Sequence, residues 1–519
     1  MNPRLLSLAL LLVVPIAPRI GPACASEWVA VTVHSGRILG VIHKAVLGVN
    51  SDTRYDDASA LRTLSRTFAT IGMAGSRWPG GNAADVLDWQ GPIRYCDWWS
   101  NQPVASDGTF DAYMNTLVLP NNLSPELTVN YATSGSPACA EAGDPKHAAA
   151  WVAYANVAKR YGVKWWEVGN EVYERVEPDN HREPHTPQSY AAFEPAFYSA
   201  MKAEDPTINV GIPITGGSHN VPNWDAYVLA NARYDYVVYH YYPTFYPSIS
   251  DAALLAAPIR GSFAVSRIMK NIRSLLASAG KCVSPCSSFP ISISEWNSVS
   301  HLPTPQTLSI VEGLFVAETL GEFFNAGVAR AEFWDDNNCE VNTSKSGYKA
   351  QLPAPVYGWQ QGVGGLGISS ASGIPGPVMC RWGASFSAPP GTIFPSGRAF
   401  QLYAQSGFAS DGSSALSVDD SSSTVRSYAS YNPAMHQYVV VVINLDGGSS
   451  AQAKLSIDGV GGGGEYQTIQ YSKDIYDDTK DNGPWAPPIS RSFGFWRFPL
   501  DVSVPPWSMT AYTFKTGQS

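Results

Sequence analysis

The chain has 519 residues, of which 45% are hydrophobic and 12% aromatic, so it is long enough to bury a large core and form two domains. Its formal net charge is −9, and its lysine and arginine residues are scattered rather than clustered. This pattern argues against nucleic acid or an anionic membrane as a partner. An uncharged or weakly charged substrate fits the composition better.

The N-terminus has the features of an export signal. Arg4 precedes an apolar run at 5–17, and Ala23-Cys24-Ala25 supplies small residues for cleavage. We therefore expect the mature chain to start near Ser26, with no later membrane-spanning stretch. The prediction is a secreted protein, extracellular or periplasmic.

Six cysteines remain in the expected mature chain, an even number that predicts up to three disulfides in an oxidising compartment. The candidate pairs are Cys282–Cys286, Cys96–Cys139 and Cys339–Cys380. The first pair is separated by only four positions, whereas the other two would each close a long loop. Connectivity stays open, and free thiols are the alternative.

From about residue 45 the sequence alternates between β-prone and helical segments, which predicts an α/β fold, a parallel (β/α)₈ TIM barrel. Eight β-prone segments are present, the number that a closed barrel needs. They are Val46–Asn50, Ala74–Trp78, Leu127–Tyr131, Lys164–Asn170, Ile208–Ile212, Tyr236–His240, Ile291–Glu295 and Ala329–Trp334. The clearest helices are Ala58–Ile71, Ala148–Tyr161 and Leu308–Ala326. A doubly wound sheet is the alternative, but no glycine-rich phosphate loop follows the first strand.

The two ends of the chain predict a second domain. After about Pro395, short alternating runs such as Tyr438–Asn444 are broken by Asp-Gly and Gly-Gly turns, as in an antiparallel β-sandwich. Residues 26–44 are also strand-like and are expected to join that sandwich. The predicted organisation is a signal peptide at 1–25, N-terminal strands at 26–44, a catalytic barrel at 45–395 and a β-sandwich at 396–519.

Two β-prone segments run directly into a glutamate. Glu171 follows the segment that ends at Asn170, and Glu295 ends the segment that starts at Ile291. Catalytic groups of a parallel barrel lie at the C-terminal strand ends, so these two carboxyl groups are expected to face each other across one pocket. Such a pair is the minimum needed to cleave a glycosidic bond. The sequence therefore predicts a glycoside hydrolase. No metal or cofactor is expected, because no cluster has metal-ligand spacing.

Four motifs at strand ends resemble the clan A glycoside hydrolases. They are Val168-Gly169-Asn170-Glu171, Ser294-Glu295-Trp296, His240 with Tyr242, and Arg77-Trp78-Pro79-Gly80-Gly81-Asn82. The last motif, followed by Asp88-Trp89, looks most like the α-L-arabinofuranosidases of family 51, with families 39, 44 and 79 as near alternatives. The resemblance covers barrel and sandwich and implies a retaining enzyme acting on oligo- or polysaccharide.

Carried over to this chain, the resemblance makes Glu171 the general acid/base and Glu295 the nucleophile, with carboxyl groups about 5–5.5 Å apart. Asn170 would hydrogen-bond the sugar hydroxyl next to the anomeric carbon. Tyr242 or Tyr241 would orient the nucleophile. Arg77 would hold the charge of the nucleophile, and His240 and Asn82 are also expected to serve the site. Trp334 could stack under a sugar face, with Trp296 and Trp78 as further sugar-stacking platforms. Glu167, deeper on its strand, is interpreted as structural.

Two long loops leave the sugar open. The loop at 174–187 carries Arg182, His181 and His185, which could grip a uronate or simply be solvated. The loop at 335–395 holds several aromatic residues and would wall the pocket. We predict an α-L-arabinofuranosidase, with β-glucuronidase, β-xylosidase, β-galactofuranosidase and endo-β-glucanase as alternatives. A non-catalytic carbohydrate-binding protein is the alternative from a different class. The sequence does not indicate an oligomeric state.

Overall fold

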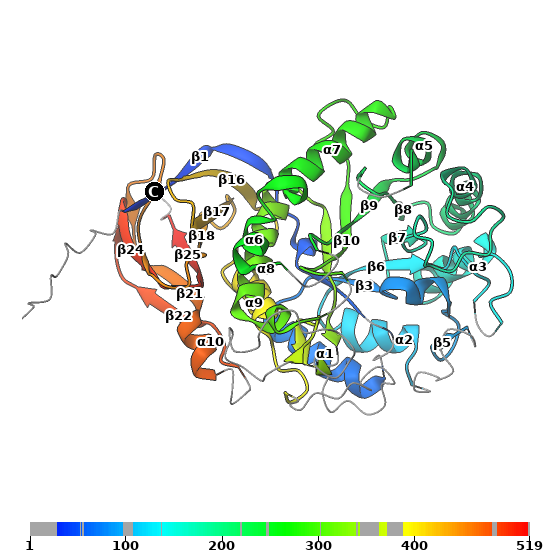
Figure 1. Cartoon of the computed structure of the whole chain (residues 1–519), viewed down its shortest axis with the longest axis horizontal. Coiled ribbons are helices and arrows are strands. Elements are labelled where there is room, and N and C mark those ends of the chain that lie inside the picture. Colours follow the sequence, from blue (N-terminus) through cyan, green and yellow to red (C-terminus); the bar gives the residue numbers. More distant parts are fainter. Residues whose placement is uncertain are drawn as a thin grey trace, which may run out of the picture.

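The computed structural model describes residues 28–51, 53, 57–96, 107–135, 138–217, 221–244, 249–300, 303–338, 341–342, 363–370, 388–479 and 485–516. The expected signal peptide therefore lies outside the described residues. So do Cys339, Cys380 and the aromatic residues Tyr357, Trp359 and Trp382 of the long loop. The described chain forms a barrel and a β-sheet domain that lies beside it (Figure 1).

The barrel is closed by eight parallel strands in the order β10-β11-β2-β3-β6-β7-β8-β9. They are β2 (Gly48–Asn50), β3 (Gly75–Trp78), β6 (Ser124–Val129), β7 (Trp165–Val168), β8 (Asn209–Pro213), β9 (Tyr236–Tyr241), β10 (Ile291–Trp296) and β11 (Arg330–Phe333). Each strand overlaps one of the eight predicted segments, so the predicted fold class is confirmed. These short segments are buried on both faces because helices cover the outside of a parallel barrel.

Helices surround the barrel (Figure 1). They are α1 (Ala58–Ile71), α2 (Phe110–Tyr113), α3 (Pro145–Val152), α4 (Pro187–Glu204), α5 (Trp224–Asn231), α6 (Asp251–Ala256), α7 (Val265–Ser278), α8 (Ile310–Asn325) and α9 (Pro395–Gln405). The side chain of Asp57 caps α1, and Gly72 ends that helix in the left-handed conformation. The predicted helix at 148–161 is α3 continued by a π-helical segment, Ala153–Ala158.

Helix α9 begins at residue 395, where the sequence predicts the domain boundary. It packs against α8 and α1 of the barrel and against β21 and β25 of the β-sheet domain. The first strand of the second domain in this part of the chain, β16, begins only at Ser414. Helix α8 joins the two domains, because its Glu318 is paired with Arg426 of the β-sheet domain at 3.1 Å.

The second domain is a nine-stranded sheet in the order β22-β21-β25-β18-β17-β16-β1-β19-β24. The strands are β1 (Val29–Val41), β16 (Ser414–Asp420), β17 (Val425–Asn432), β18 (Gln437–Asn444), β19 (Ala451–Ile457), β21 (Tyr466–Ser472), β22 (Ile489–Phe493), β24 (Leu500–Val504) and β25 (Ser508–Lys515). The sheet curves so that β24 contacts β18 and β25, which gives two layers around an apolar core (Figure 1). The N-terminal strand β1 pairs with β16 and β19, as predicted.

Short elements complete the described chain. They are 3₁₀ turns at Lys44–Val46, Gly81–Asp85, Gly261–Phe263 and Pro305–Leu308, a π-helical segment at Met114–Val118, helix α10 (Lys473–Thr479), and the strands β4 (Leu87–Asp88), β5 (Arg94–Tyr95), β12 (Asn337–Asn338), β13 (Val341–Asn342), β14 (Val363–Gly364), β15 (Ser369–Ser370), β20 (Gly462–Gly463) and β23 (Trp496–Arg497).

Two of the three candidate disulfides are present in the described residues. Cys96 is bonded to Cys139, and Cys282 to Cys286. One described stretch, Asp251–Ser278, is long and apolar enough to cross a membrane, judged by length and composition alone. In the structure this stretch is divided between α6, a 3₁₀ turn and α7, and α7 buries one face within the molecule.

Candidate functional site

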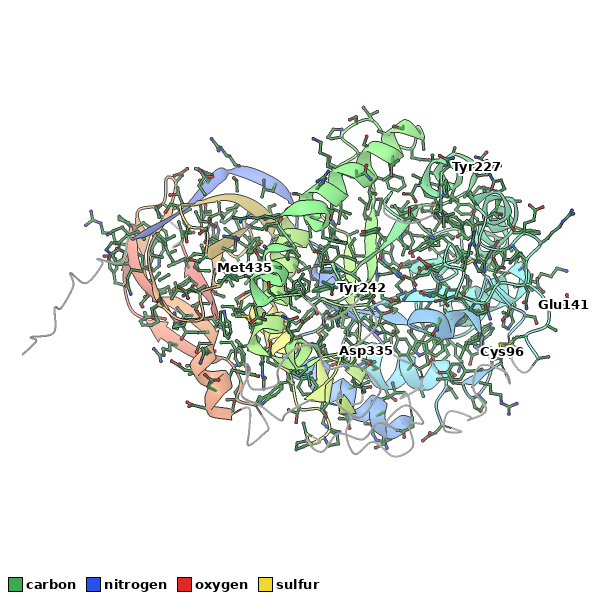
Figure 2. The ribbon with its side chains drawn as sticks, viewed as in Figure 1. Cys96, Glu141, Tyr227, Tyr242, Asp335 and Met435 are labelled. Carbon is green, nitrogen blue, oxygen red and sulfur yellow. A yellow bond between two sulfur atoms is a disulfide. The ribbon has the colours of Figure 1, made fainter. Side chains whose placement is uncertain are left out.

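Polar side chains gather where the barrel strands end. Asn50 is the last residue of β2. Arg77 and Glu295 are the last residues but one of β3 and β10. Asn170 and Glu171 follow β7, whereas His240 and Tyr242 lie at the end of β9. Figure 2 places Tyr242 near the middle of the molecule. The strand-end residues named from the sequence are therefore brought to one end of the barrel.

Glu295 is held by two donors. The Tyr242 hydroxyl donates to Oε1 at 2.7 Å, and Nη1 of Arg77 donates to Oε2 at 3.2 Å. Burial and then the charge of Glu295 raise the pKa of Tyr242 well above its usual range, so the hydroxyl keeps its proton. Both contacts fix the orientation of the Glu295 carboxyl group. They also decide between the two candidate tyrosines, because Tyr241 donates instead to the backbone oxygen of Phe263.

Glu171 has a different partner. Its Oε1 lies 2.7 Å from Nδ1 of His240, and Nε2 of His240 lies 3.1 Å from the hydroxyl of Ser294. Glu171 itself has a left-handed backbone, with φ at +39°, and its side chain is 23% exposed. Gly169, two residues before Glu171, also has a left-handed backbone conformation. A Cβ at this position would lie 2.5 Å from Val172. This turn lifts Glu171 off the strand end toward the open side of the barrel.

The glutamate pair, Glu171 and Glu295, is close enough for double displacement. One ligand atom from each of these residues and from His240 lies within 4.8 Å of the others. Carboxyl groups of retaining glycosidases are about 5–5.5 Å apart, whereas inverting enzymes separate them by roughly 6.5–9.5 Å to admit a water. An oxygen of each carboxyl group within 4.8 Å of the other places the pair nearer to the spacing of retaining enzymes than to that of inverting ones.

Arg77 connects the pair to the barrel interior. Its guanidinium donates to Glu167 Oε2 at 2.8 Å, Asn50 Oδ1 at 3.0 Å and Asn170 Oδ1 at 2.9 Å, besides Glu295. Burial opposes the charge of Arg77, but the carboxylates of Glu167 and Glu295 outweigh it and raise the pKa of the guanidinium. Glu167 thus pairs with Arg77 in the interior and does not join the glutamate pair.

A second buried ion cluster lies deeper in the barrel. Arg330 contacts Glu126 at 2.8 Å and Glu332 at 2.7 Å. Glu126 also accepts from the hydroxyl of Tyr236 at 2.6 Å and from Ser292 at 2.9 Å. The sequence reasoning missed these residues and Asn50, although charged residues inside short apolar strands were a visible signal.

The prediction that Trp296 and Trp78 form sugar-stacking platforms is wrong. Trp296 is fully buried and packs against Phe323 and Phe333, with ring centroids 5.2 and 5.0 Å apart. Trp78 is fully buried against Tyr113. Adjacent residues of a strand point to opposite faces. Because Arg77 and Glu295 point into the barrel, the tryptophans that follow them point outward under the helices.

Trp334 and Asn82 remain nearer the surface. Trp334 is half-buried, and its indole packs on the backbone of Gly80 and Gly81. A Cβ on Gly81 would lie 2.5 Å from the indole, and Gly81 has φ at +62°, so this glycine pair serves packing. Asn82 is exposed in the 3₁₀ turn that follows. Binding of substrate by these two side chains stays a prediction.

The two histidines that the sequence offered for a uronate grip in the loop at 174–187 have partners within the protein, whereas Arg182 is exposed. His181 is 6% exposed, stacks on Tyr131 with centroids 4.1 Å apart and contacts Asp179 at 2.9 Å. Nδ1 of His185 lies 3.2 Å from the backbone oxygen of Val172. His181 therefore packs on the segment that follows β6, and His185 contacts the chain just before the loop.

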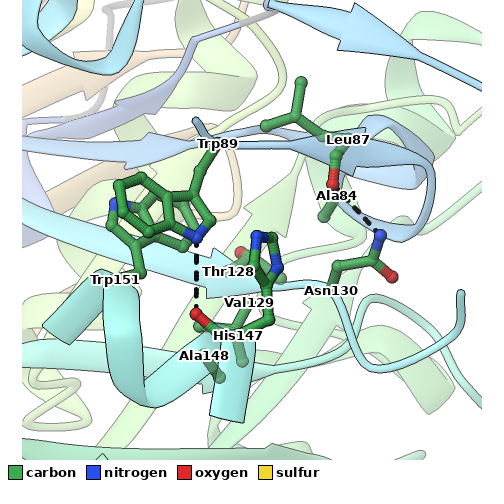
Figure 3. Close-up of a pocket in the computed structure, with 9 residues that line it drawn as sticks. All are labelled: Ala84, Leu87, Trp89, Thr128, Val129, Asn130, His147, Ala148 and Trp151. Carbon is green, nitrogen blue, oxygen red and sulfur yellow. Dashed lines mark hydrogen bonds between the residues drawn. The ribbon is translucent and has the colours of Figure 1, made fainter. Parts of the chain in front are cut away.

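A small cavity behind the barrel wall is separate from the pair. It has a volume of about 10 Å³, room for roughly one water, and lies between β6 and α3. Figure 3 shows Trp89 beside Trp151, with the Trp89 indole donating to the backbone oxygen of His147 and Asn130 donating to that of Leu87. Its lining holds no carboxylate among the residues the structure describes there.

Glu171, His240 and Glu295 lie close enough together to bind one metal ion. Among the described residues, no other group of acidic, histidine or cysteine side chains does so. Sequence spacing gave no sign of this group, because its members come from three separate strands. The 2.7 Å contact between His240 and Glu171 already satisfies these two side chains as a hydrogen bond.

No protein-family model matches the sequence, and no curated protein matches it. Solved structures do share its fold. An α-L-arabinofuranosidase from Thermotoga maritima, solved with arabinose, is 16% identical, and the match covers 94% of this chain and 100% of that chain with a TM-score of 0.69. A family 51 arabinofuranosidase from Xanthomonas axonopodis is 14% identical, with coverage of 94% and 99% and a TM-score of 0.63. A family 44 xyloglucanase from Paenibacillus polymyxa is 12% identical, with coverage of 95% and 100% and a TM-score of 0.63.

These likenesses define the class of fold. The chain is a (β/α)₈ barrel with an attached β-sandwich domain, the architecture of the family 51 and family 44 glycoside hydrolases it matches. The match spans nearly the whole length of both partners, so barrel and sandwich are shared together.

Proposed function

We propose that the protein is a retaining glycoside hydrolase in which Glu295 is the nucleophile and Glu171 the general acid/base. The observation that carries the proposal is the close approach of the two carboxyl groups at the C-terminal end of the barrel, within 4.8 Å through one oxygen each. The different partners of the two groups support the division of roles. The fold shared with glycoside hydrolases of families 51 and 44 adds further support.

In the first step, the Glu295 carboxylate attacks the anomeric carbon and forms an ester to the sugar. Glu171 gives its proton to the glycosidic oxygen, which leaves as an alcohol. Arg77 and Tyr242 each donate a hydrogen bond to Glu295 and orient it for attack. The amide nitrogen of Asn170 has no hydrogen-bond partner among the described residues, so it is available to a sugar hydroxyl.

In the second step, Glu171, now ionised, removes a proton from water. The hydroxide attacks the anomeric carbon, the ester bond to Glu295 breaks, and the sugar leaves with its original configuration. His240 is placed to hydrogen-bond Glu171 in both charge states, since its Nδ1 lies 2.7 Å from the carboxyl oxygen.

The substrate we propose is an α-L-arabinofuranoside. The strand-end motifs and the fold shared with the arabinofuranosidase from Thermotoga maritima support this choice. An endo-acting β-glucanase is the second candidate, because the xyloglucanase from Paenibacillus polymyxa shares the fold over the same length. We also propose that the protein is secreted, which its two disulfides support.

The test is hydrolysis of chromogenic glycosides by the wild-type protein and by Glu295→Ala. The panel comprises α-L-arabinofuranoside, β-xyloside, β-glucoside, β-glucuronide and β-galactofuranoside, with xyloglucan and β-glucan as polymeric substrates. Activity on one sugar that disappears in the variant supports the proposal and identifies the sugar. Binding of these sugars without turnover by the wild-type protein would favour a carbohydrate-binding protein instead.

A further inference from the structure

Strand β10 carries one residue more than its neighbours just before its end. Between the pairs Ser292–Val238 and Glu295–His240, β10 advances by three positions while β9 advances by two. The pairing of β10 with β11 shows the same excess. An extra residue of this kind is a β-bulge, which re-aims side chains and is frequent next to active sites. The bulge lets Ser294 and Glu295, although adjacent in sequence, both approach His240.

The imidazole of His240 lies between Ser294 and the glutamate pair. Its Nδ1 lies 2.7 Å from Oε1 of Glu171 and 3.8 Å from Oε2 of Glu295. Its Nε2, on the other side of the ring, lies 3.1 Å from Oγ of Ser294. Both the imidazole and Ser294 are buried, so these contacts are shielded from water. Ser294 therefore reaches Glu171 through the ring.

The position of the hydrogen on the imidazole decides what the ring does to Glu171. With hydrogen on Nδ1, the ring donates to Oε1 of Glu171, and Nε2 accepts from Ser294. With hydrogen on Nε2, Nδ1 can only accept, which draws the acid proton of Glu171 onto Oε1. A doubly protonated ring favours an ionised Glu171, which has no proton to give. Only the first form leaves the acid proton on Oε2, where the ring does not hold it.

The Ser294 hydroxyl favours that first form. Nε2 of His240 is its only hydrogen-bond partner among the described residues. If Nε2 carried a hydrogen, the serine would accept it, and the hydrogen of the serine would lack an acceptor in the described barrel. A buried donor without an acceptor is costly, whereas an unused lone pair is tolerated more readily. The hydroxyl is therefore best satisfied when it donates to a bare Nε2.

The charges around the ring act in both directions. Glu171 and Glu295 face Nδ1, and Glu167 interacts with the ring from deeper in the barrel, so these carboxyl groups favour a second proton on the imidazole. Burial of the ring opposes that proton, and Arg77 offsets the charges of Glu167 and Glu295 through its ion pairs with them. A hydroxyl that donates to Nε2 adds to the neutral side of this balance.

We propose that Ser294 is a positioning residue whose hydroxyl donates to Nε2 of His240, holds the imidazole neutral with its hydrogen on Nδ1, and thereby keeps the acid proton of Glu171 directed away from the ring. Ser294 acts through His240 and does not touch the substrate. This inference rests on the proposed role of Glu171 as general acid/base.

NMR of the wild-type protein with isotope-labelled histidine observes the hydrogen position directly. Long-range proton–nitrogen correlations distinguish the two neutral forms of a histidine from the doubly protonated one, and the signals of His240 are those missing from His240→Gln. At the pH of highest activity we expect a neutral His240 with its hydrogen on Nδ1. A hydrogen on Nε2, alone or together with one on Nδ1, would overturn the inference.

Kinetics of Ser294→Ala test the consequence for proton transfer. Without the hydroxyl, the ring can carry hydrogen on Nε2, and Glu171 donates its proton less readily. We expect kcat/KM on an oligosaccharide of the cleaved sugar to fall about 5- to 10-fold, the range for loss of one hydrogen bond. On the dinitrophenyl glycoside, whose leaving group needs no proton, the change should stay below about twofold. Equal losses on the two substrates, or no loss on either, would overturn the inference.

Ser292→Ala is the matched control. Ser292 lies on the same strand, is equally buried and donates to Glu126 at 2.9 Å, deeper in the barrel. Its loss should affect stability but leave the ratio of the two kcat/KM values unchanged, whereas the same change of ratio as in Ser294→Ala would assign the effect to packing and overturn the inference. Ser294→Thr keeps a hydroxyl and should restore the wild-type ratio. A folded Ser294→Thr with the ratio of Ser294→Ala would also overturn it.

Failure of this inference is distinguishable from failure of the proposed function. A wild-type protein that cleaves no glycoside removes the proposed function, while the hydrogen position on His240 is still measured by NMR. An active wild-type protein whose His240 carries its hydrogen on Nε2 removes only the inference.

Discussion

Replacing Arg77 by methionine should cost both stability and activity, for reasons that can be separated. Arg77 is 0% exposed and makes one ion pair of 2.8 Å with the equally buried Glu167. Removing it leaves a buried carboxylate without its partner, which typically costs about 3–5 kcal/mol. The double variant Arg77→Met/Glu167→Gln removes the stranded charge, so it should recover roughly 2 kcal/mol or more of that loss.

Urea unfolding followed by tryptophan fluorescence measures these free energies, with Arg182→Met as the control because Arg182 is exposed. Hydrolysis should stay low in both the single and the double variant, since neither supplies the donor that reaches Glu295. An Arg77→Met variant less than about 1 kcal/mol below the wild type would refute the reasoning. So would a double variant that is no more stable than the single one.

Three further predictions rest on single contacts. Tyr242→Phe removes one charge-assisted hydrogen bond to Glu295, so kcat should fall about 10- to 100-fold with the melting temperature almost unchanged, and a kcat within twofold of wild type would contradict this. Burial raises the pKa of Glu194 to about 8, so the folded state keeps a proton that the unfolded state releases above about pH 4.5; wild-type stability is lost as pH rises through this window. Melting curves at pH 5 and pH 8 should therefore show Glu194→Gln gaining on the wild type at the higher pH, and a constant difference would count against it. Gly81→Ala should destabilise the protein by about 1–3 kcal/mol, because the new Cβ meets Trp334 at a left-handed φ; a variant as stable as the wild type in urea would disprove the packing argument.

The barrel could be predicted because eight short β-prone segments alternate with helical ones along the chain. Glu171 and Glu295 stood out because each lies at or just after the end of such a segment, and the structure brings one oxygen of each within 4.8 Å of the other. The two tyrosines after β9 could not be ranked from sequence, because the choice depends on where the chain bends beyond the strand. The structure resolves it, with Tyr242 bonded to Glu295.

Other errors and omissions have separate causes. Trp296 and Trp78 were open to correction from sequence alone, since strand alternation places them opposite Glu295 and Arg77. Helix α9 was not predicted from the sequence, and it packs against elements of both domains at the predicted boundary.

The most direct test of the two-carboxylate account is to trap the glycosyl ester. Glu171→Ala mixed with a dinitrophenyl glycoside of the cleaved sugar needs no acid for the first step but lacks the base for the second, so the ester should accumulate. Peptide mass spectrometry should then find the sugar attached to Glu295. A sugar attached to another residue, or a wild-type product released with inverted configuration, would contradict the account.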